Sequence, residues 1–179
     1  DQPLPAILNV WFGGSEAAYA ISDVLFGDVN PSGKLTATFP QNVGQIPLFY
    51  NHKNTGRPLQ EGRWFEKFRS NYLDVSNEPL YPFGYGLSYT TFAYSDIHLS
   101  STEMSADGEL TATVTVTNTG SRDGAEVVQL YIRDLVGSVT RPVKELKGFE
   151  KIFLKAGESR KVSFSITPEL LKFYNYDLQ

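Results

Sequence analysis

The sequence contains no cysteine and only two histidines, His52 and His98. The missing cysteines exclude thiol nucleophiles, disulfides and thiolate metal sites. The two histidines lie in different segments, without the close His, Asp and Glu spacing that a zinc site needs. We therefore expect neither a bound metal nor a cofactor.

Positive charge and long apolar runs are also scarce. Sixteen Lys and Arg stand against 20 Asp and Glu, so the net charge is −4, which argues against a general nucleic-acid binder. No run reaches the ~18 to 20 apolar residues of a membrane span. The first residues lack the charged region and cleavage site of a secretory signal. Because the chain opens without Met and leads directly into an apolar run, we expect a fragment of a longer protein.

The first part of the chain alternates strand and helix signals. Ala6–Phe12 is a short apolar run that ends at two glycines, which predicts a strand buried on both faces. Apolar residues then recur at helical spacing from a Ser15 N-cap to a stop at Gly27. Lys34–Phe39 alternates and predicts a second strand. Together these signals predict part of an α/β unit.

Residues 41–75 form a stretch of ~35 residues with little periodicity, and loops this long are usually functional or disordered. Their aromatic content argues against disorder. Aromatic rings beside Arg, Glu and His can bind sugars, but the same residues can also simply dock the loop onto a neighbouring domain. Glu61 and Glu66 invite comparison with the carboxylate pair of a glycosidase, although a solvated or salt-bridged pair is the simpler interpretation.

The second half has the period of β-strands. In 110–117, Leu, Ala and Val alternate with Thr, which predicts one buried and one wet face. Counting 92–99 as the first, the second half has at least five predicted strands at roughly ten-residue spacing: 92–99, 110–117, 126–132, 146–154 and 162–166. This pattern predicts an antiparallel all-β sandwich of the fibronectin type III-like kind. Since such domains have about seven strands, we expect the last strand to be lacking.

Asn77–Phe92 separates the two halves. It holds two prolines and two glycines, which exclude a regular helix, together with five aromatic rings. We interpret it as a rigid connector whose Tyr81, Phe83, Tyr85 and Tyr89 offer apolar surface to both halves.

Five collinear motifs resemble the C-terminal part of glycoside hydrolase family 3, and within it the bacterial periplasmic β-glucosidases. They cover residues 23–40, 46–58, 79–92, 114–134 and 141–164. The resemblance implies a multidomain enzyme with an N-terminal (β/α)8 barrel, a middle α/β sandwich domain and a fibronectin type III-like domain. Residues 1–76 are then the C-terminal portion of the α/β domain with its long loop, 77–91 the connector, and 92–179 the fibronectin type III-like domain.

The implied reaction is the retaining hydrolysis of terminal β-linked sugars by an Asp nucleophile and a Glu acid/base. Both are expected upstream of Asp1, so no catalytic residue is assigned here, and Asp23 is expected to be structural. The implied partners are the N-terminal barrel of the same protein and an oligosaccharide or β-glucoside substrate, with no nucleic acid, no membrane and a homodimer as a further option. The implied location is periplasmic or secreted.

Within this resemblance the long loop contributes to the rim of the sugar pocket. The substrate-binding candidates are His52, Arg57, Glu61, Arg63 and Trp64. Two alternatives stay open: a non-catalytic carbohydrate-binding or interaction module, and a sandwich that only braces the catalytic domains or a dimer interface.

Overall fold

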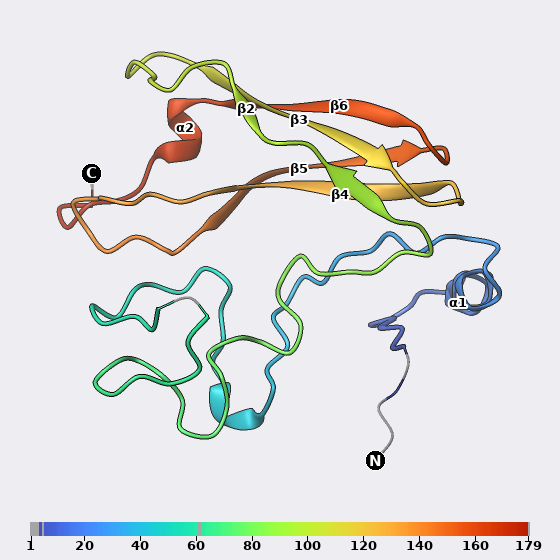
Figure 1. Ribbon diagram of the computed structural model, residues 1–179, viewed down its shortest axis with the longest axis horizontal. Coiled ribbons are helices and arrows are strands. Elements are labelled where there is room, and N and C mark those ends of the chain that lie inside the picture. Colours follow the sequence, from blue (N-terminus) through green and yellow to red (C-terminus); the bar gives the residue numbers. More distant parts are fainter. Residues whose placement is uncertain (1–3, 5, 61, 179) are drawn as a thin grey trace.

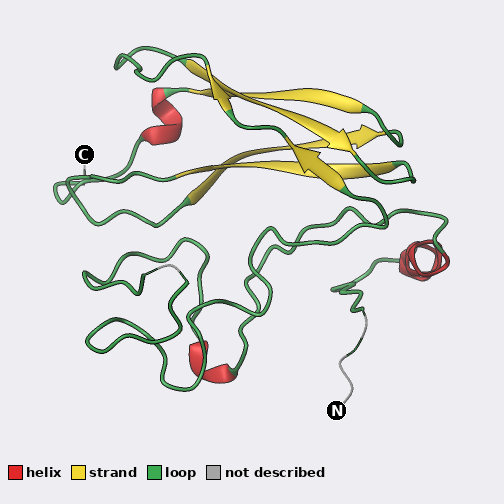
Figure 2. Cartoon of the chain, viewed as in Figure 1, coloured by secondary structure: helices red, strands yellow, loops and turns green. Residues whose placement is uncertain are grey.

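The computed structural model describes residues 4, 6–60 and 62–178. The C-terminal half is a β-sandwich, and the N-terminal half runs beneath it in the view of Figure 1 as largely irregular chain (Figures 1 and 2). The elements follow one another as α1 (Ala17–Phe26), the 3-10 helix η1 (Val43–Gln45), β1 (Phe92–Tyr94), β2 (His98–Leu99), β3 (Leu110–Asn118), β4 (Gly124–Ile132), β5 (Glu145–Leu154), β6 (Ser159–Ile166) and α2 (Pro168–Leu171).

The sandwich consists of two antiparallel sheets. In the four-stranded sheet, β3 is central: β1 and β2 pair with different parts of one of its edges, and β6 pairs along the other. The second sheet consists of β4 and β5. The structure therefore confirms an all-β sandwich in the second half of the chain.

The alternation in β3 divides its residues between core and surface as the sequence predicts. Val116 is fully buried and packs with Val128 of β4, Ile152 and Leu154 of β5, and Val162 of β6. On the outer face, Thr113 and Thr117 exchange hydroxyl hydrogen bonds with serines of β6. Burying a side chain of this size contributes about 1.5 to 3 kcal/mol, so this cluster is the main stabilising unit of the sandwich.

The strand predicted over 92–99 is two short strands, β1 and β2. Between them the side chain of Ser95 replaces a backbone carbonyl, because its Oγ accepts the hydrogen bond of the Thr115 N–H at 2.9 Å. The backbone N–H of Ser95 still donates to the Thr115 carbonyl at 2.9 Å. A serine hydroxyl can compete with the ladder in this way, which the strand pattern alone does not reveal.

The predicted strand at Ala6–Phe12 is wrong for the described residues 6–12, which form no strand. No described segment pairs with them, and Trp11 and Phe12 are 55% and 103% exposed. A buried parallel strand needs neighbours on both sides, and the described part of the chain provides none. Helix α1 does form, but its N-cap is Glu16 rather than Ser15, while Gly27 ends it with a left-handed φ of 83° as expected.

The predicted strand at Lys34–Phe39 is also wrong, and the connector explains why. Leu35 and Phe39 exchange backbone hydrogen bonds with the connector around Tyr85 and Tyr81, so the two segments run antiparallel. Pro82 lies between these two contacts and has no N–H to donate. The ladder is therefore interrupted before it becomes a strand.

The backbone of the connector lies in direct contact with both halves of the chain. The N–H of Gly84 donates to the Leu35 carbonyl at 2.8 Å, while its carbonyl accepts from the Gln129 side chain at 3.1 Å. An added Cβ at Gly86 would overlap the Gly33 carbonyl oxygen. Glycine is thus required where the connector backbone approaches its neighbours.

An ion pair between a half-buried lysine and a buried glutamate reinforces the same junction. Lys34 Nζ lies 3.0 Å from Glu126 Oε2 and donates to the Gly86 carbonyl at 3.1 Å. Glu126, on β4, is 8% exposed and also accepts the Tyr94 hydroxyl at 2.8 Å. Burial and Glu126 raise the pKa of the Tyr94 phenol. The Glu126 carboxylate therefore joins Lys34 of the N-terminal half to both sheets, and Lys34 in turn holds the connector at Gly86.

We expect Gly86→Ala to destabilise the chain by about 1 to 3 kcal/mol, because the new methyl group forces the connector away from Gly33. Gly33→Ala is the matched control, since a Cβ there meets nothing within 4 Å. Urea denaturation of the two variants measures the difference. Equal midpoints would contradict the close approach.

The raised pKa of Tyr94 predicts a loss of stability at alkaline pH. Above about pH 10 the unfolded tyrosine loses its proton while the folded one keeps it, so stability falls as pH rises. Tyr94→Phe cannot titrate, and the stability gap between wild type and this variant should narrow between about pH 9 and pH 11.5. Urea titrations at a series of pH values measure the gap, and a gap independent of pH would argue against the buried hydrogen bond to Glu126.

Candidate functional site

A cavity of about 670 Å³ lies between the irregular loop of the N-terminal half and the segment that leads into β5. Its lining mixes aromatic, amide, hydroxyl and charged side chains. The residues come from four segments of the chain, 47–63, 70–72, 76–83 and 143–144, together with Thr38. A cavity with apolar faces and several hydrogen-bonding groups suits a polar ligand that also presents C–H surface.

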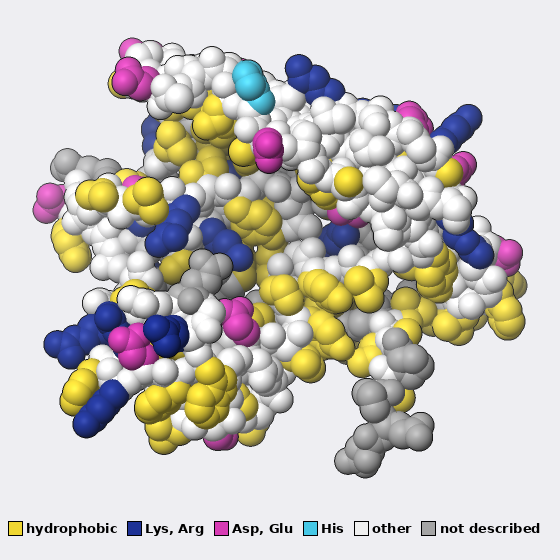
Figure 3. Space-filling view, viewed as in Figure 1, with side chains coloured by type: hydrophobic (Ala, Val, Ile, Leu, Met, Phe, Trp, Pro, Cys, Tyr) yellow, Lys and Arg dark blue, Asp and Glu magenta, His cyan; other side chains and the backbone are white. Residues whose placement is uncertain are grey.

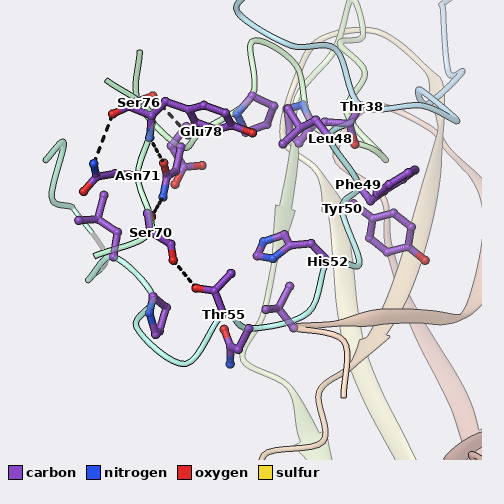
Figure 4. A pocket seen from close by; sticks show the side chains of 18 of the residues that line it. Thr38, Leu48, Phe49, Tyr50, His52, Thr55, Ser70, Asn71, Ser76 and Glu78 are labelled. Atoms are coloured by element: carbon purple, nitrogen blue, oxygen red, sulfur yellow. Dashed lines mark hydrogen bonds between the residues drawn. The ribbon is translucent and has the colours of Figure 1, made fainter. Parts of the chain in front are cut away.

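One wall is the turn that carries His52. The N–H of His52 donates to the Phe49 carbonyl at 3.3 Å, and His52 Nδ1 lies 3.3 Å from the Lys53 carbonyl oxygen. In Figure 4 the imidazole projects into the middle of the cavity, with Tyr50 on one side and Asn71 on the other. His52 is exposed, and because Nδ1 faces the Lys53 carbonyl, the Nε2 edge of the ring is the one open to a ligand.

The opposite wall is supported by Gln45, which ends the 3-10 helix η1 and does not itself line the cavity. This side chain is 1% exposed, and its Nε2 donates to the carbonyls of Ser76 and Glu78 at 3.0 and 3.1 Å. Its Oε1 accepts from the Gln41 N–H, and its carbonyl accepts the Tyr72 hydroxyl at 3.0 Å. One amide side chain thus satisfies backbone groups that a sheet would otherwise pair.

The two walls meet through hydroxyl and amide groups. Thr55 and Ser70 lie 2.5 Å apart through their hydroxyl oxygens (Figure 4). Asn77 Nδ2 donates to the Ser70 carbonyl at 2.8 Å, and the Ser70 N–H donates to the Arg57 carbonyl at 2.9 Å. The loop is therefore an ordered structure closed on itself.

The residues expected at a sugar pocket are only partly brought together. His52 and Arg63 line the cavity, whereas Arg57 and Trp64 do not, and Glu61 lies outside the described residues. Trp64 is 58% exposed beside Phe65. Strict spacing along an irregular loop does not decide which side chains converge, so the sequence cannot separate these residues.

Of the possible carboxylate pair Glu61 and Glu66, only Glu66 lies among the described residues. Its Oε1 lies 3.3 Å from Arg69 Nε, an ion pair with a partner three residues away. This fits the salt-bridged interpretation for Glu66.

Several aromatic residues of the cavity were not among the sequence candidates. Tyr50 stacks on Phe83 with ring centroids 4.2 Å apart and meets Tyr131 edge-on at 6.0 Å. Tyr72 and Asn71 line the opposite side. The aromatic density of the connector and of the stretch around Tyr50 is the signal that predicts such stacking, but it does not identify the partners.

The described residues hold no group of three or more His, Asp or Glu that could bind a metal ion. Asp23 lies on α1, its backbone carbonyl accepts from the Val29 N–H at 3.1 Å, and it does not line the cavity. No helix in the described part of the chain is long and apolar enough to cross a membrane.

Family comparisons give the site its context. Residues 1–89 match the glycosyl hydrolase family 3 C-terminal domain, and residues 126–179 match the fibronectin type III-like domain. This chain belongs to glycoside hydrolase family 3. The first match ends at residue 89, within the connector, and the second begins at residue 126, inside β4.

The similarity to named relatives covers all or nearly all of the chain. A periplasmic beta-glucosidase of Salmonella typhimurium is 58% identical over 179 residues, which is 100% of this chain and 23% of the relative. A beta-xylosidase of Formosa agariphila is 46% identical over 176 residues, covering 98% of this chain and 23% of the relative. The chain thus spans about a quarter of the length of these family 3 proteins.

Solved family 3 structures share the fold. The beta-glucosidase of Listeria innocua, in complex with isofagomine, aligns with a TM-score of 0.87 at 47% identity and covers 94% of this chain and 24% of that one. The family 3 beta-glucosidase of Bifidobacterium adolescentis aligns with a TM-score of 0.65 at 36% identity, over 89% of this chain and 23% of that one.

We expect Gln45→Ala to open the cavity wall, because it leaves the Ser76 and Glu78 carbonyls and the Gln41 N–H without their partner. Losing buried hydrogen bonds of this kind costs about 1 to 3 kcal/mol. Hydrogen exchange of residues 70–79 should accelerate. Gln60→Ala, an exposed glutamine of the same loop, is the control; equal exchange in the two variants would argue against Gln45 as the centre of the wall.

Proposed function

We propose that this chain is the C-terminal region of a retaining, exo-acting β-glycosidase of the β-glucosidase type. The observation that carries the proposal is the likeness along all 179 residues to a protein named as a periplasmic beta-glucosidase. The xylosidase relatives keep the identity of the terminal sugar open between glucose and xylose. Because the chain spans about a quarter of these relatives, the activity belongs to the full-length protein.

Retaining hydrolysis needs a nucleophilic carboxylate and an acid/base carboxylate about 5 to 5.5 Å apart. We assign both, an Asp and a Glu, to the part of the protein that lies outside this chain. The pairing of Glu66 with Arg69 supports this assignment, since that carboxylate already has an ion-pair partner. This chain then supplies a rim to the sugar site and a brace for the catalytic domain.

The proposed partner within the protein is an N-terminal catalytic barrel with the remainder of an α/β domain. Exposed apolar side chains gather on the N-terminal half, along the lower edge of Figure 3. Trp11, Phe12, Leu25 and Phe26 are all more than half exposed, and such a patch marks a surface that another part of the protein covers. The division into 1–76, 77–91 and 92–179 follows from the same proposal.

The sandwich invites a similar proposal for its smaller sheet. Within the described chain β5 pairs with β4 alone, and Phe149 and Phe153 on its outward face are 68% and 53% exposed. We infer that the sandwich takes a further strand on this sheet. This is the strand that the sequence pattern predicts to be lacking.

At the rim, His52 and Arg63 are the residues we assign to sugar binding. Both line the cavity. An imidazole that donates from Nδ1 to the Lys53 carbonyl accepts a hydroxyl hydrogen bond at Nε2 in its neutral form, and the Arg63 guanidinium donates to hydroxyl oxygens. Arg57, Glu61 and Trp64 remain predictions for the outer rim.

A periplasmic or secreted location and a homodimer likewise belong to the proposal, and sedimentation of the full-length protein tests the dimer.

The experiment that tests the function is hydrolysis of aryl β-glucosides and β-xylosides by the full-length protein. We expect release of the aryl group with retained stereochemistry at the anomeric carbon, which proton NMR follows directly. Failure on every aryl glycoside, or an inverted product, would overturn the proposal.

We expect His52→Ala and Arg63→Ala to raise KM by about five- to thirtyfold, because each removes a hydrogen bond of about 1 to 2 kcal/mol to the sugar. Arg160→Ala, which removes a surface arginine paired with Glu158 at 3.8 Å on the sandwich, is the matched control. Steady-state kinetics of the full-length variants provide the comparison. An unchanged KM in both cavity variants would remove them from the rim.

The cavity also favours a second function, carbohydrate binding without catalysis, because residues of this chain form the cavity without any other domain. As a carbohydrate-binding module, the 179-residue chain would bind gluco-oligosaccharides without any catalytic domain. Calorimetric titration with cellobiose and laminaribiose decides this. A flat titration counts against a module and leaves the glycosidase proposal intact.

A further inference from the structure

One wall of the cavity belongs to the sandwich. Val143 and Lys144, directly before β5, line the cavity together with His52 and Lys53. These pairs of residues are about 90 positions apart in the sequence. The sandwich is therefore part of the cavity and more than a neighbouring domain.

Backbone contacts join the two segments. Lys53 and Pro142 form an antiparallel bridge, and the Val143 N–H donates to the His52 carbonyl at 2.9 Å. This hydrogen bond fixes the backbone at the residue whose imidazole projects into the cavity (Figure 4).

Tyr50 provides a second attachment two residues earlier. Its hydroxyl oxygen accepts the N–H of Leu146, on β5, at 3.2 Å. Its ring is held between Phe83 of the connector, stacked at 4.2 Å and 14°, and Tyr131 of β4, edge-on at 6.0 Å. Phe83 and Tyr131 thus clamp the ring while Leu146 holds the hydroxyl.

We propose that the sandwich, through Val143 and Leu146, positions the His52 turn and thereby sets how tightly the cavity binds its sugar. The proposal rests on the glycosidase function proposed above. Residues 50–53 have no regular secondary structure of their own, so their conformational freedom is restricted by these attachments. Removing an attachment leaves the cavity present but the imidazole poorly placed, because a site on a loop depends on its supporting contacts.

Positioning and plain bracing differ in what they change. If the sandwich only braces the protein, weakening it lowers stability and leaves substrate parameters alone. If it positions His52, a loss of the attachment raises KM while kcat is retained, since the reacting carboxylates lie elsewhere.

The test compares two Tyr→Phe changes that each remove one hydroxyl. Tyr50→Phe keeps the ring stack but loses the acceptor for the Leu146 N–H, and Tyr94→Phe loses the hydrogen bond to Glu126 within the sandwich. We expect Tyr50→Phe to raise KM of the full-length protein roughly three- to tenfold with kcat within about twofold, the range that one hydrogen bond allows. Tyr94→Phe should leave KM unchanged.

A second arm does not depend on activity. Hydrogen exchange of the 179-residue chain should accelerate over residues 49–55 and at the Val143 amide in Tyr50→Phe, and stay as in wild type in Tyr94→Phe. Val143→Pro removes the N–H of the second attachment and should accelerate the amides of residues 49–55.

Unchanged exchange over 49–55 in Tyr50→Phe would overturn the positioning, and so would a loosened turn with unchanged KM. A full-length wild type that hydrolyses no glycoside overturns the proposed function and, with it, the sugar-binding half of this proposal. The exchange arm still decides whether the sandwich holds the His52 turn.

Discussion

The close approach of the connector backbone to Gly33 is the contact on which the arrangement of the two halves depends. With no Cβ at Gly86, Lys34 can reach both the Gly86 carbonyl and Glu126 on the sandwich. Removing Lys34 leaves the buried Glu126 carboxylate without its counter-charge, which is destabilising. Shape and charge together thus determine how the two halves meet at this junction. The nearby cavity is lined by residues from both halves.

Amide side chains organise the parts of the chain that lack a ladder. Gln45 supports the cavity wall, and Asn30 links the N-terminal half to Tyr89 and to Asp123 through its side chain. Asn118, fully buried at the end of β3, accepts from Thr90 and Gly120 and donates to the carbonyls of Arg122 and Leu154. Because an unpaired buried backbone group is costly, these amides are what allow an irregular chain to be ordered.

Three segments of this family 3 chain contribute residues to one cavity. The sandwich supplies a wall, the connector supplies Phe83, and the long loop supplies His52 and Arg63. A binding surface shared among three segments responds to changes in any of them.

The sequence by itself determined the sandwich strands and the end of α1 at Gly27, because a two-residue period and a left-handed glycine are local properties. It placed all five binding candidates in one loop, whereas the cavity also takes residues from the connector and from the segment before β5. Only the tertiary structure decided that His52 and Arg63 line the cavity while Arg57 and Trp64 do not, because convergence in an irregular loop depends on distant partners such as Val143. The apolar run at Ala6–Phe12 has the composition of a strand, yet a strand exists only where another backbone pairs with it.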